Sequence, residues 1–326
     1  MDQWLLVLTA TGSVFAVIGV GMFTRYVGWL TEEADESLLK LCIELLYPCL
    51  IFSTISDNPA LRETSNILLP PVVGFSTVII GLVVAWAVMR LSPRVHGLGR
   101  ANQRYTFIIA AGIYNYGFIP IPLISMLFDD ANRTLGVLFV HNTGTSLAIW
   151  TVGIVVLCGG LTKGWWRNVV NMPTITIVIS LLVNLTGVNK YFHHAEFLLK
   201  AIESIGDAAI PLSILLVGAT ITDQLKPGNN RTSFRDAVKV IGWGCFVRIL
   251  AVPALFLLIA VYLPCSPELR RVIVIQAAMP SAVFSIILAR MYGGDAGAAI
   301  RIVVATSALS LVTVPLWISL GLWLIG

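Results

Sequence analysis

The sequence has few charged residues. Asp, Glu, Lys and Arg make up 12% of the 326 residues, about half the share of a typical soluble domain, whereas hydrophobic residues make up 57%. A soluble core of this length cannot bury so much apolar surface, and the charges cluster between long apolar stretches, as membrane topology requires. The composition therefore excludes a soluble globular domain and indicates an integral membrane protein. The net charge of +4 belongs to the connecting segments and does not indicate nucleic-acid binding.

Cysteine clusters and the sequence motifs of catalysis are also missing. The five cysteines include no CxxC pair and no Cys/His cluster, which excludes a disulfide framework, and we expect neither a metal nor a cofactor. The chain contains no HExxH, GxSxG, Walker A or Rossmann glycine pattern. Residues 292–295 (YGGD) approach the GxGD pattern of intramembrane aspartyl proteases, but Tyr292 stands where that pattern has glycine. These absences argue against an enzyme.

Long apolar stretches fill the chain instead. A membrane-spanning helix needs roughly 20 apolar residues, and the sequence contains about ten such stretches. The predicted spans are 4–24, 35–56, 67–89, 104–127, 133–158, 170–187, 198–222, 238–262, 268–291 and 299–324. The second and seventh are interrupted by Lys40, Glu44, Glu203 and Asp207. Because the connections are short, we expect an all-α membrane protein with a single domain over residues 1–326.

The distribution of Lys and Arg predicts the orientation of the spans. Twelve of these residues lie in odd-numbered connections between spans and five lie in even-numbered ones. Cytoplasmic loops are enriched in Lys and Arg, so the odd-numbered connections are predicted to be cytoplasmic. Both termini are then predicted to lie outside.

Two sets of landmarks recur at nearly one separation, which predicts an internal repeat. Pro48 and Pro211 are 163 residues apart, and Asp130 and Asp295 are 165 residues apart. A repeat of five helices contains an odd number of spans, so the second copy must insert upside down, as in transporters that bind substrate between inverted repeats. Chance similarity between apolar helices is the alternative. The predicted repeats cover residues 1–158 and 170–326.

Proline and glycine predict a break in the fourth span. Pro120 and Pro122 provide no N–H, which leaves carbonyls one turn earlier, that of Tyr116 among them, without helical partners. Gly117 loosens the same segment. Because freed backbone groups must find partners in protein or water, we expect a break between about 116 and 121. N–H groups just beyond the prolines are expected to offer an anion site.

The ninth span has a proline at its midpoint. Pro280 frees the carbonyl of Gln276, and the hydroxyl of Ser281 or Ser285 is expected to compensate. At the repeat offset, Asn115 of the fourth span corresponds to Pro280. Two broken helices at matching places predict a crossover of four half-helix ends, where N-terminal ends suit anions and C-terminal ends suit cations.

Polar side chains near this crossover are candidate ligands of a substrate. The Asn115 amide can donate two hydrogen bonds to a carboxylate, although a hydrogen bond between helices is a common role for membrane Asn. The fifth and tenth spans contribute His141, Asn142 and Thr306, although hydroxyls often bond to their own helix. The predicted substrate-binding residues are Asn115, Gly117, Pro120, Pro122, His141, Asn142, Pro280, Ser281 and Thr306.

Two acidic residues interrupt the seventh span. Glu203 and Asp207 are four residues apart, and as like charges on one helix face they need a cation or a proton. They are candidate acids for proton coupling, with Arg248 and Arg301 as candidate partners. A structural salt bridge or exposure at the membrane interface is the alternative.

Four short motifs together resemble one transporter family. Residues 115–123 (NYGFIPIPL) resemble a fourth-span NxxxxGxPL pattern, and residues 274–280 (VIQAAMP) are similar to a ninth-span QAA(L/M)P pattern. Residues 171–174 (NMPT) and 248–253 (RILAVP) resemble patterns of the sixth and eighth spans. Together, in this order, the motifs resemble the auxin efflux carrier family, which includes plant PIN-type carriers and bacterial permeases.

The resemblance implies a fold related to bile-acid symporters and sodium/proton antiporters. It implies a scaffold of spans 1, 2, 6 and 7 and a moving unit of spans 3–5 and 8–10. It also implies elevator-type alternating access, an anion whose carboxylate binds near Asn115, and a homodimer. Bacterial members are associated with malate, malonate and similar acids, and plant members carry indole-3-acetate.

Some residues depart from the family pattern. Pro120 stands where many relatives have glycine, and Ser285 stands where plant carriers have a second proline. The connection at 159–169 is too short for the long cytoplasmic loop of many plant carriers. We therefore predict a bacterial-type permease of the plasma membrane that moves small carboxylates. A membrane receptor or scaffold that binds a ligand without moving it is the alternative, and downhill flux discriminates between the two.

Overall fold

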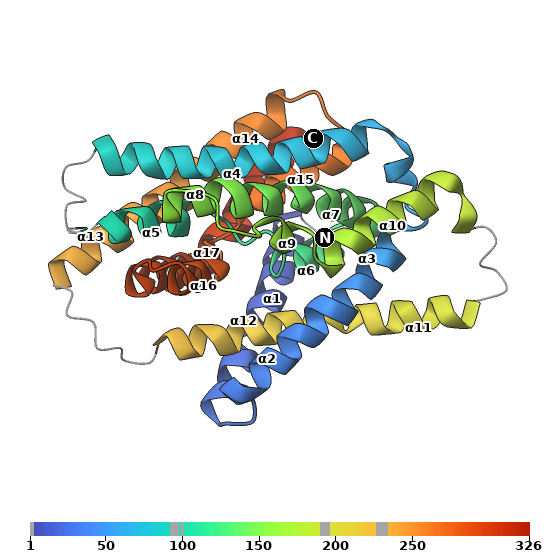
Figure 1. Ribbon diagram of the computed structural model, residues 1–326. Coiled ribbons are helices and arrows are strands. Elements are labelled where there is room, and N and C mark those ends of the chain that lie inside the picture. The colour runs from blue at the N-terminus through green and yellow to red at the C-terminus, as the bar shows by residue number, and fades with distance from the viewer. Residues whose placement is uncertain (1–2, 92–97, 99–100, 190–195, 226–233) are drawn as a thin grey trace.

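Every regular element in the described part of the chain is a helix. This computed structural model describes residues 3–91, 98, 101–189, 196–225 and 234–326 (Figure 1). In chain order the elements are α1 (Gln3–Tyr26), α2 (Glu32–Leu41), η1 (Cys42–Leu46), α3 (Tyr47–Ile55), η2 (Pro59–Arg62), α4 (Ser65–Leu91), α5 (Ala101–Gly112), α6 (Pro120–Leu127), α7 (Ala131–Ala148), η4 (Ile149–Gly153), α8 (Ile154–Cys158), α9 (Trp166–Val169), α10 (Met172–Thr186), α11 (Glu196–Asp207), α12 (Ala209–Leu225), α13 (Phe234–Cys245), η6 (Phe246–Ala251), α14 (Val252–Tyr262), α15 (Pro267–Ala278), α16 (Phe284–Met291) and α17 (Ala296–Ile325).

Seven helical stretches of the described chain are long and apolar enough to cross a membrane. They are Trp4–Tyr26, Glu32–Ile55, Ser65–Leu91, Ala131–Cys158, Glu196–Asp223, Arg235–Tyr262 and Ala296–Ile325. A shorter apolar helix, Met172–Thr186, occupies the sixth predicted span. The two other predicted spans are the ones expected to be broken, and each consists of two short helices, α5 and α6 in one and α15 and α16 in the other. The all-helical membrane fold predicted from the sequence is confirmed.

The break in the fourth span is longer than the sequence predicts. Its non-helical segment covers residues 113–119, so it begins three residues earlier than the expected 116. In the ninth span, α15 ends at Ala278 and α16 begins at Phe284, around the expected position of Pro280. The prolines explain where α6 restarts, but the early end of α5 depends on a partner from the other half of the chain, described below.

Two π-helical segments lie just before prolines in the second and eighth spans. Segment η1 ends two residues before Pro48, and η6 ends two residues before Pro253. A proline lacks an N–H and its ring clashes with the carbonyl one turn earlier, and a widened turn accommodates one extra residue there. Both spans therefore continue through their prolines as helices.

Contacts between odd-numbered connections lie together at one end of the bundle. Arg25, at the end of α1, forms ion pairs with Asp35 of α2 and, at 3.2 Å, with Asp223 of α12. Gln103 of α5 donates a 2.8 Å hydrogen bond to Asp295, which precedes α17. These contacts join the first connection to the seventh and the third to the ninth.

Contacts between even-numbered connections lie together as well. Asn189 donates a 2.7 Å hydrogen bond to Asp57, which joins the sixth connection to the second. Arg133 of α7 lies 3.0 Å from the Glu268 carboxylate of α15, which joins the fourth connection to the eighth. Odd-numbered connections thus contact odd-numbered ones, and even-numbered connections contact even-numbered ones. A chain that crosses a bilayer with each span requires this. The predicted cytoplasmic side and the predicted repeat boundaries stay predictions.

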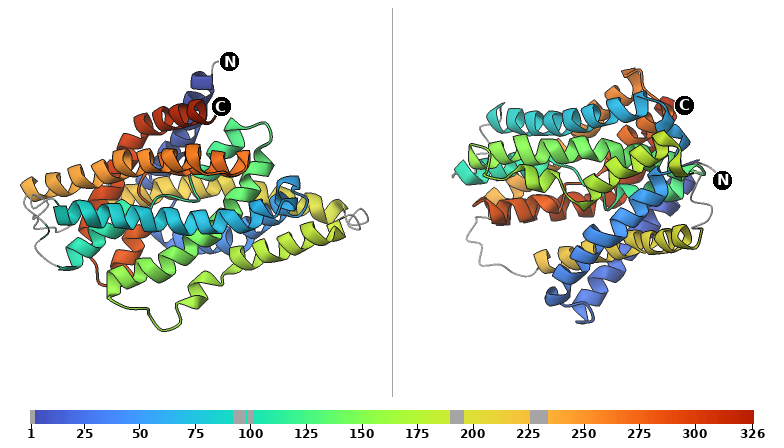
Figure 2. Two further views of the ribbon diagram at one scale, coloured as in Figure 1. Left: turned by 90° about the horizontal axis from the view of Figure 1, so that it is seen from above. Right: turned by 45° about the vertical axis from the view of Figure 1, so that its right-hand side comes forward.

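Several helix pairs pack with their backbones in close contact at glycine, and the two closest approaches are those of α4 with α7 and of α1 with α12. A Cβ on Gly144 of α7 would lie 1.8 Å from the Pro71 carbonyl oxygen of α4, and a Cβ on Gly218 of α12 would lie 2.1 Å from the Ile18 carbonyl oxygen of α1. Small residues permit this approach in membrane bundles, where apolar burial alone does not hold helices together. Helices α2, α11 and α12 lie along one side of the molecule and α4, α14 and α15 along the other (Figures 1 and 2).

Replacing Gly144 tests the α4–α7 contact. Gly144→Ala is expected to lower the stability of the detergent-solubilised protein by about 1–3 kcal/mol, because the methyl group would force the two backbones apart. Gly19→Ala in α1 is the matched control, since a Cβ there meets nothing within 4 Å. Melting temperatures from intrinsic tryptophan fluorescence would measure both, and equal values for the two variants would contradict the close packing.

Candidate functional site

The two non-helical segments of spans four and nine cross each other and pair through their backbones. The Asn115 N–H donates to the Pro280 carbonyl at 2.9 Å, and the Ala282 N–H donates to the Ile113 carbonyl at 3.0 Å. Tyr114 and Ser281 form an antiparallel bridge between these bonds. Within a membrane, unwound backbone is stable only where its polar groups find partners, and each segment supplies the partners of the other.

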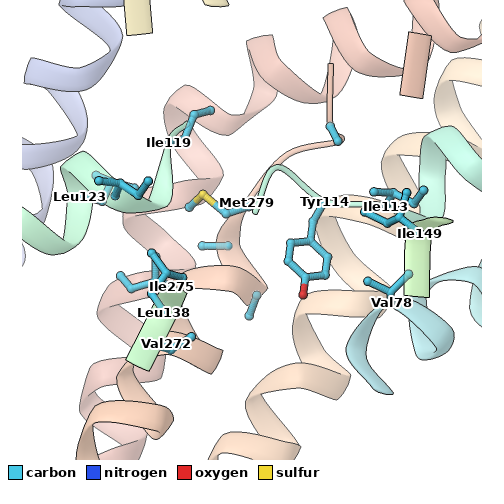
Figure 3. Close-up of a cluster of buried hydrophobic side chains, with 14 of the residues drawn as sticks. Val78, Ile113, Tyr114, Ile119, Leu123, Leu138, Ile149, Val272, Ile275 and Met279 are labelled. Atoms are coloured by element: carbon cyan, nitrogen blue, oxygen red, sulfur yellow. The ribbon is translucent and has the colours of Figure 1, made fainter. Parts of the chain in front are cut away.

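Buried apolar side chains enclose the crossing. Met279, on the ninth-span segment, and Tyr114, on the fourth-span segment, lie near its centre (Figure 3). The labelled side chains around them come from both halves of the chain: Val78, Ile113, Ile119, Leu123, Leu138, Ile149, Val272 and Ile275. This packing keeps water from the paired backbone and fixes the position of the helix ends.

The carbonyl that Pro120 frees has two side-chain partners. The Tyr116 carbonyl accepts hydrogen bonds from Asn142 Nδ2 at 2.9 Å and from Gln276 Nε2 at 3.1 Å. The expectation that this carbonyl needs a partner outside its helix is therefore confirmed. Asn142 comes from α7 and Gln276 from α15, so one freed group ties three spans together.

The corresponding expectation for the ninth span is wrong. The Gln276 carbonyl accepts a 3.3 Å hydrogen bond from the Met279 N–H, not from the hydroxyl of Ser281 or Ser285. Both hydroxyl oxygens are buried without a hydrogen-bond partner among the described residues. The tight turn at the end of α15 satisfies the carbonyl locally, so it needs no hydroxyl. The Ser281 N–H instead donates to Thr306 Oγ1 at 3.3 Å.

The start of α6 does not offer the anion site that its prolines led us to expect. The N–H of Ile121 donates to Gly117 and that of Leu123 donates to Ile119. Pro120 and Pro122 have no N–H, so the first turn of α6 has no donor left. At the start of α16, the N–H groups of residues 283 and 284 have no acceptor among the described residues, and the same holds for residues 118 and 119 just before α6.

A cavity of about 410 Å³ lies beside the crossover. It is lined by the non-helical segments of spans four and nine with the adjoining α6 and α16, by α7 and η4, and by η1, α3, α9 and α10. Its aromatic lining residues are Tyr47, Tyr116, Phe118, Phe139, Trp150 and Phe284. Its polar and charged lining residues are Asn115, Asn142, Thr143, Ser146, Arg167, Asn168, Asn171 and Thr174. Both predicted units of the transporter therefore contribute walls.

Asn115 is the predicted ligand that the geometry supports most directly. Its side chain lines the cavity, and the residue is only 5% exposed. Its N–H is held by Pro280, whereas its amide group makes no hydrogen bond to any described side chain or backbone group. A buried polar group normally has a partner. The backbone of Asn115 is thus fixed in position, and its side-chain amide is free to bind a ligand.

The other predicted ligands divide into two groups. Gly117 and Asn142 also line the cavity. The remaining residues are buried behind its lining: Pro120, Pro122, His141, Pro280, Ser281 and Thr306. His141 supports the lining indirectly, because its Nδ1 lies 3.3 Å from the Asn142 side-chain oxygen.

The candidate coupling acids lie elsewhere. Glu203 and Asp207 are exposed on α11 and do not line the cavity. Arg248, one of their proposed partners, is fully buried beside Tyr114 at the crossover. The two acids are therefore exposed at the surface of the bundle, in line with the alternative of interfacial exposure. Their role in proton coupling stays a prediction.

The sequence does not indicate two residues that the structure brings to the site. Arg167, in the connection between the two halves, lines the cavity, and Gln276 binds the Tyr116 carbonyl. Gln276 belongs to the motif at residues 274–280 that contains Pro280. A polar amide one turn before this proline is a signal for a hydrogen-bonding role at the break. No local pattern around Arg167 predicts that this connection folds back to the cavity.

Comparison with known proteins identifies the family. The profile of a family described as "Membrane transport protein" matches residues 6–163 and 160–318. An uncharacterized transporter of Methanothermobacter thermautotrophicus is 25% identical over 308 residues, covering 94% of this chain and 95% of its own. An uncharacterized transporter of Methanocaldococcus jannaschii is 23% identical over 312 residues, covering 93% and 95%. Protein PIN-LIKES 7 of Arabidopsis thaliana is 22% identical over 126 residues, 38% of this chain and 30% of its own.

These matches agree with the motifs at the crossover. The profile covers nearly the whole chain, and the two archaeal relatives align over nearly their whole length. A transporter family is consistent with the missing enzyme motifs. The chain belongs to the membrane transport protein family, that of the auxin efflux carriers.

Proposed function

We propose that the protein is a secondary transporter that moves small organic anions across the membrane. The family supports transport, and the charge of the cavity supports the anion. Among the described residues that line the cavity, Arg167 is the only charged one and none is acidic. A cation would meet no countercharge there, whereas an anion would meet a guanidinium at the cavity wall.

The free donors beside the crossover support a carboxylate. The Asn115 amide can donate two hydrogen bonds, and the N–H groups of Val283 and Phe284 at the start of α16 have no acceptor among the described residues. All three residues line the cavity. The N-terminal end of a helix carries a partial positive charge, which favours a bound carboxylate without a second fixed cation.

The size and lining of the cavity favour an anion with an apolar body. Six aromatic residues line about 410 Å³, more space than a small diacid needs. A second carboxylate, as in malate or malonate, would lose much of its hydration among these aromatic residues, and Arg167 is the only cation that the described cavity lining offers it. Within the predicted substrate class, an auxin-like monocarboxylate therefore fits the cavity better than a diacid.

The cavity walls support alternating access. Asn115 and Asn142 belong to the predicted moving unit, whereas Tyr47 and Asn171 belong to the predicted scaffold. A rigid-body movement of the crossover along the scaffold would carry the bound anion between the two sides, which is the elevator mechanism. The proposal includes a homodimer in the plasma membrane with both termini outside. The mouth beside Arg167 would then face the cytoplasm.

Solute uptake into proteoliposomes tests the proposal. We expect a saturable flux of at least one acid from a panel of malate, malonate, succinate, pyruvate and indole-3-acetate, with indole-3-acetate favoured. Asn115→Ala should lower the apparent affinity by roughly tenfold or more, because a hydrogen bond to a charged group contributes about 1.5–3 kcal/mol. Current on solid-supported membranes and radiolabelled uptake would measure it.

Asn132→Ala is the matched control, since Asn132 is exposed and lies outside the cavity lining. No current and no labelled flux for any of the five acids, from folded protein, would contradict organic-anion transport. Specific binding of an acid without flux would favour the receptor. If Asn115→Ala binds the acid with wild-type affinity, the proposed position of the substrate carboxylate at the crossover would be contradicted.

Arg167 gives a second test of the anion site. Arg167→Gln should raise the KM of the transported acid roughly two- to fivefold at low salt, with less effect at high salt, because the guanidinium is exposed and screened. Lys163→Gln removes the same charge from the same connection, but Lys163 does not line the cavity. Equal KM values for the two variants would contradict a local role of Arg167.

A further inference from the structure

Arg248 is a charged side chain buried at the crossover. It belongs to the π-helical segment η6 of the eighth span, and only 1% of its surface is exposed. It does not line the cavity, so it does not contact the proposed substrate. A charge inside the membrane is costly and persists only where it has a stabilising partner or a role.

Arg248 has no acidic partner among the described residues. Two other charged residues, Arg25 and Glu268, are buried in the described chain, and both form ion pairs. Arg248 forms none, and one long hydrogen bond, from Nη2 to the Ala277 carbonyl at 3.5 Å, is its only polar contact with the described residues. Its Nε and Nη1 atoms are buried without a partner among those residues. The cation is thus uncompensated by any described carboxylate.

The guanidinium contacts both crossing segments. Its Cζ lies 5.4 Å from the ring centroid of Tyr114, in the fourth-span segment, and 5.7 Å from that of Phe256. The Tyr114 hydroxyl is fixed by a 2.8 Å hydrogen bond with Thr77. Ala277, the acceptor of the Nη2 hydrogen bond, lies in the last turn of α15. Arg248 therefore joins the aromatic ring of one broken span to the helix end of the other.

The position suits a cation. The last carbonyls of a helix have no intrahelical partners and carry a partial negative charge, and the electron-rich faces of aromatic rings also attract cations. At crossings of broken membrane helices, such carbonyl ends can bind dissolved cations. The described residues contain no group of three or more His, Cys, Asp or Glu that could hold a metal ion.

We propose that Arg248 is a built-in cation of the crossover. It stabilises the carbonyl end of α15 against the Tyr114 segment, and it offsets the charge of the bound carboxylate from behind the crossing segments. Anion transport then needs no dissolved cation such as sodium. The offset of the carboxylate charge and the independence from a dissolved cation rest on the proposed function. The stabilisation of the α15 end does not. Arg248 is a positioning residue, because it acts through Tyr114 and Ala277.

Chemical rescue tests the built-in cation without requiring transport. Arg248→Ala removes the atoms that N-ethylguanidinium contains, and N-ethylurea is its uncharged counterpart. We expect millimolar N-ethylguanidinium to raise the melting temperature of the variant by about 2 °C or more, as a ligand of the folded state does, and N-ethylurea to leave it unchanged. Equal stabilisation by both compounds, or by neither, would overturn the proposal.

Arg90→Ala is the matched control. The Arg90 guanidinium also lies 5.4 Å from an aromatic centroid, that of Trp86, but Arg90 is exposed at the end of α4. Neither compound should stabilise this variant. If Arg248→Ala does not fold, Arg248→Lys and Arg248→Met replace it. We expect Lys to preserve the melting temperature better than Met, and the reverse order would overturn the proposal.

Uptake of indole-3-acetate tests the consequences for transport. Arg248→Met should slow uptake roughly tenfold or more, because a displaced crossover moves Asn115 away from its binding geometry. Wild-type uptake should be equal in sodium, potassium and N-methylglucamine at constant ionic strength. Sodium-dependent uptake would overturn the built-in cation. Absence of wild-type uptake of all five acids, together with successful rescue of Arg248→Ala, would contradict the proposed function and leave the structural role of Arg248 intact.

Discussion

Two backbone hydrogen bonds hold the crossing on which the rest of the structure depends. They join Asn115 to Pro280 and Ala282 to Ile113, residues that are more than 160 positions apart in the chain. In lipid, an interrupted helix exposes N–H and C=O groups that each cost several kcal/mol if they stay unpaired. Because the two interruptions satisfy each other, two spans can be broken at the centre of the molecule. The broken ends then provide binding groups that an intact helix keeps within its own hydrogen bonds.

Side-chain amides bind a backbone carbonyl that the crossing leaves free, and Asn142, which carries one of them, lines the cavity together with Asn115. Asn142 and Gln276 satisfy the Tyr116 carbonyl, while the neighbouring Asn115 amide has no partner among the described residues. An asparagine thus has a structural role at position 142, whereas the amide of the asparagine at position 115 is available to a ligand, and both residues line the same cavity. What separates the roles is whether a freed carbonyl lies within reach. The backbone N–H of Asn115 donates to Pro280, which fixes the backbone and leaves the side-chain amide available to a ligand.

Charged side chains of this protein lie in different surroundings, among them the ends of the bundle, the cavity wall and the apolar interior. Ion pairs such as those of Arg25 and Glu268 lie where the connections gather at the two ends of the bundle, and they tie the connections of each end together. Arg167 is exposed at the cavity wall. Arg248 alone of these stands in the apolar interior without a described acid, against two aromatic rings and a helix end. One fixed positive charge inside and one at the wall support the proposed preference for anions.

The sequence by itself determined the all-helical membrane fold and the two broken helices, because apolar length and proline chemistry are local properties that hold in any context, and its short motifs indicated the family. It also identified Asn115 through its place beside the prolines. Only the tertiary structure decided which donors are free. It showed that the N–H groups of α6 are used, that Gln276 serves the Tyr116 carbonyl, and that Arg167 reaches the cavity. Hydrogen-bond satisfaction and long-range approach depend on which segment lies opposite, and residues distant along the chain supply that segment.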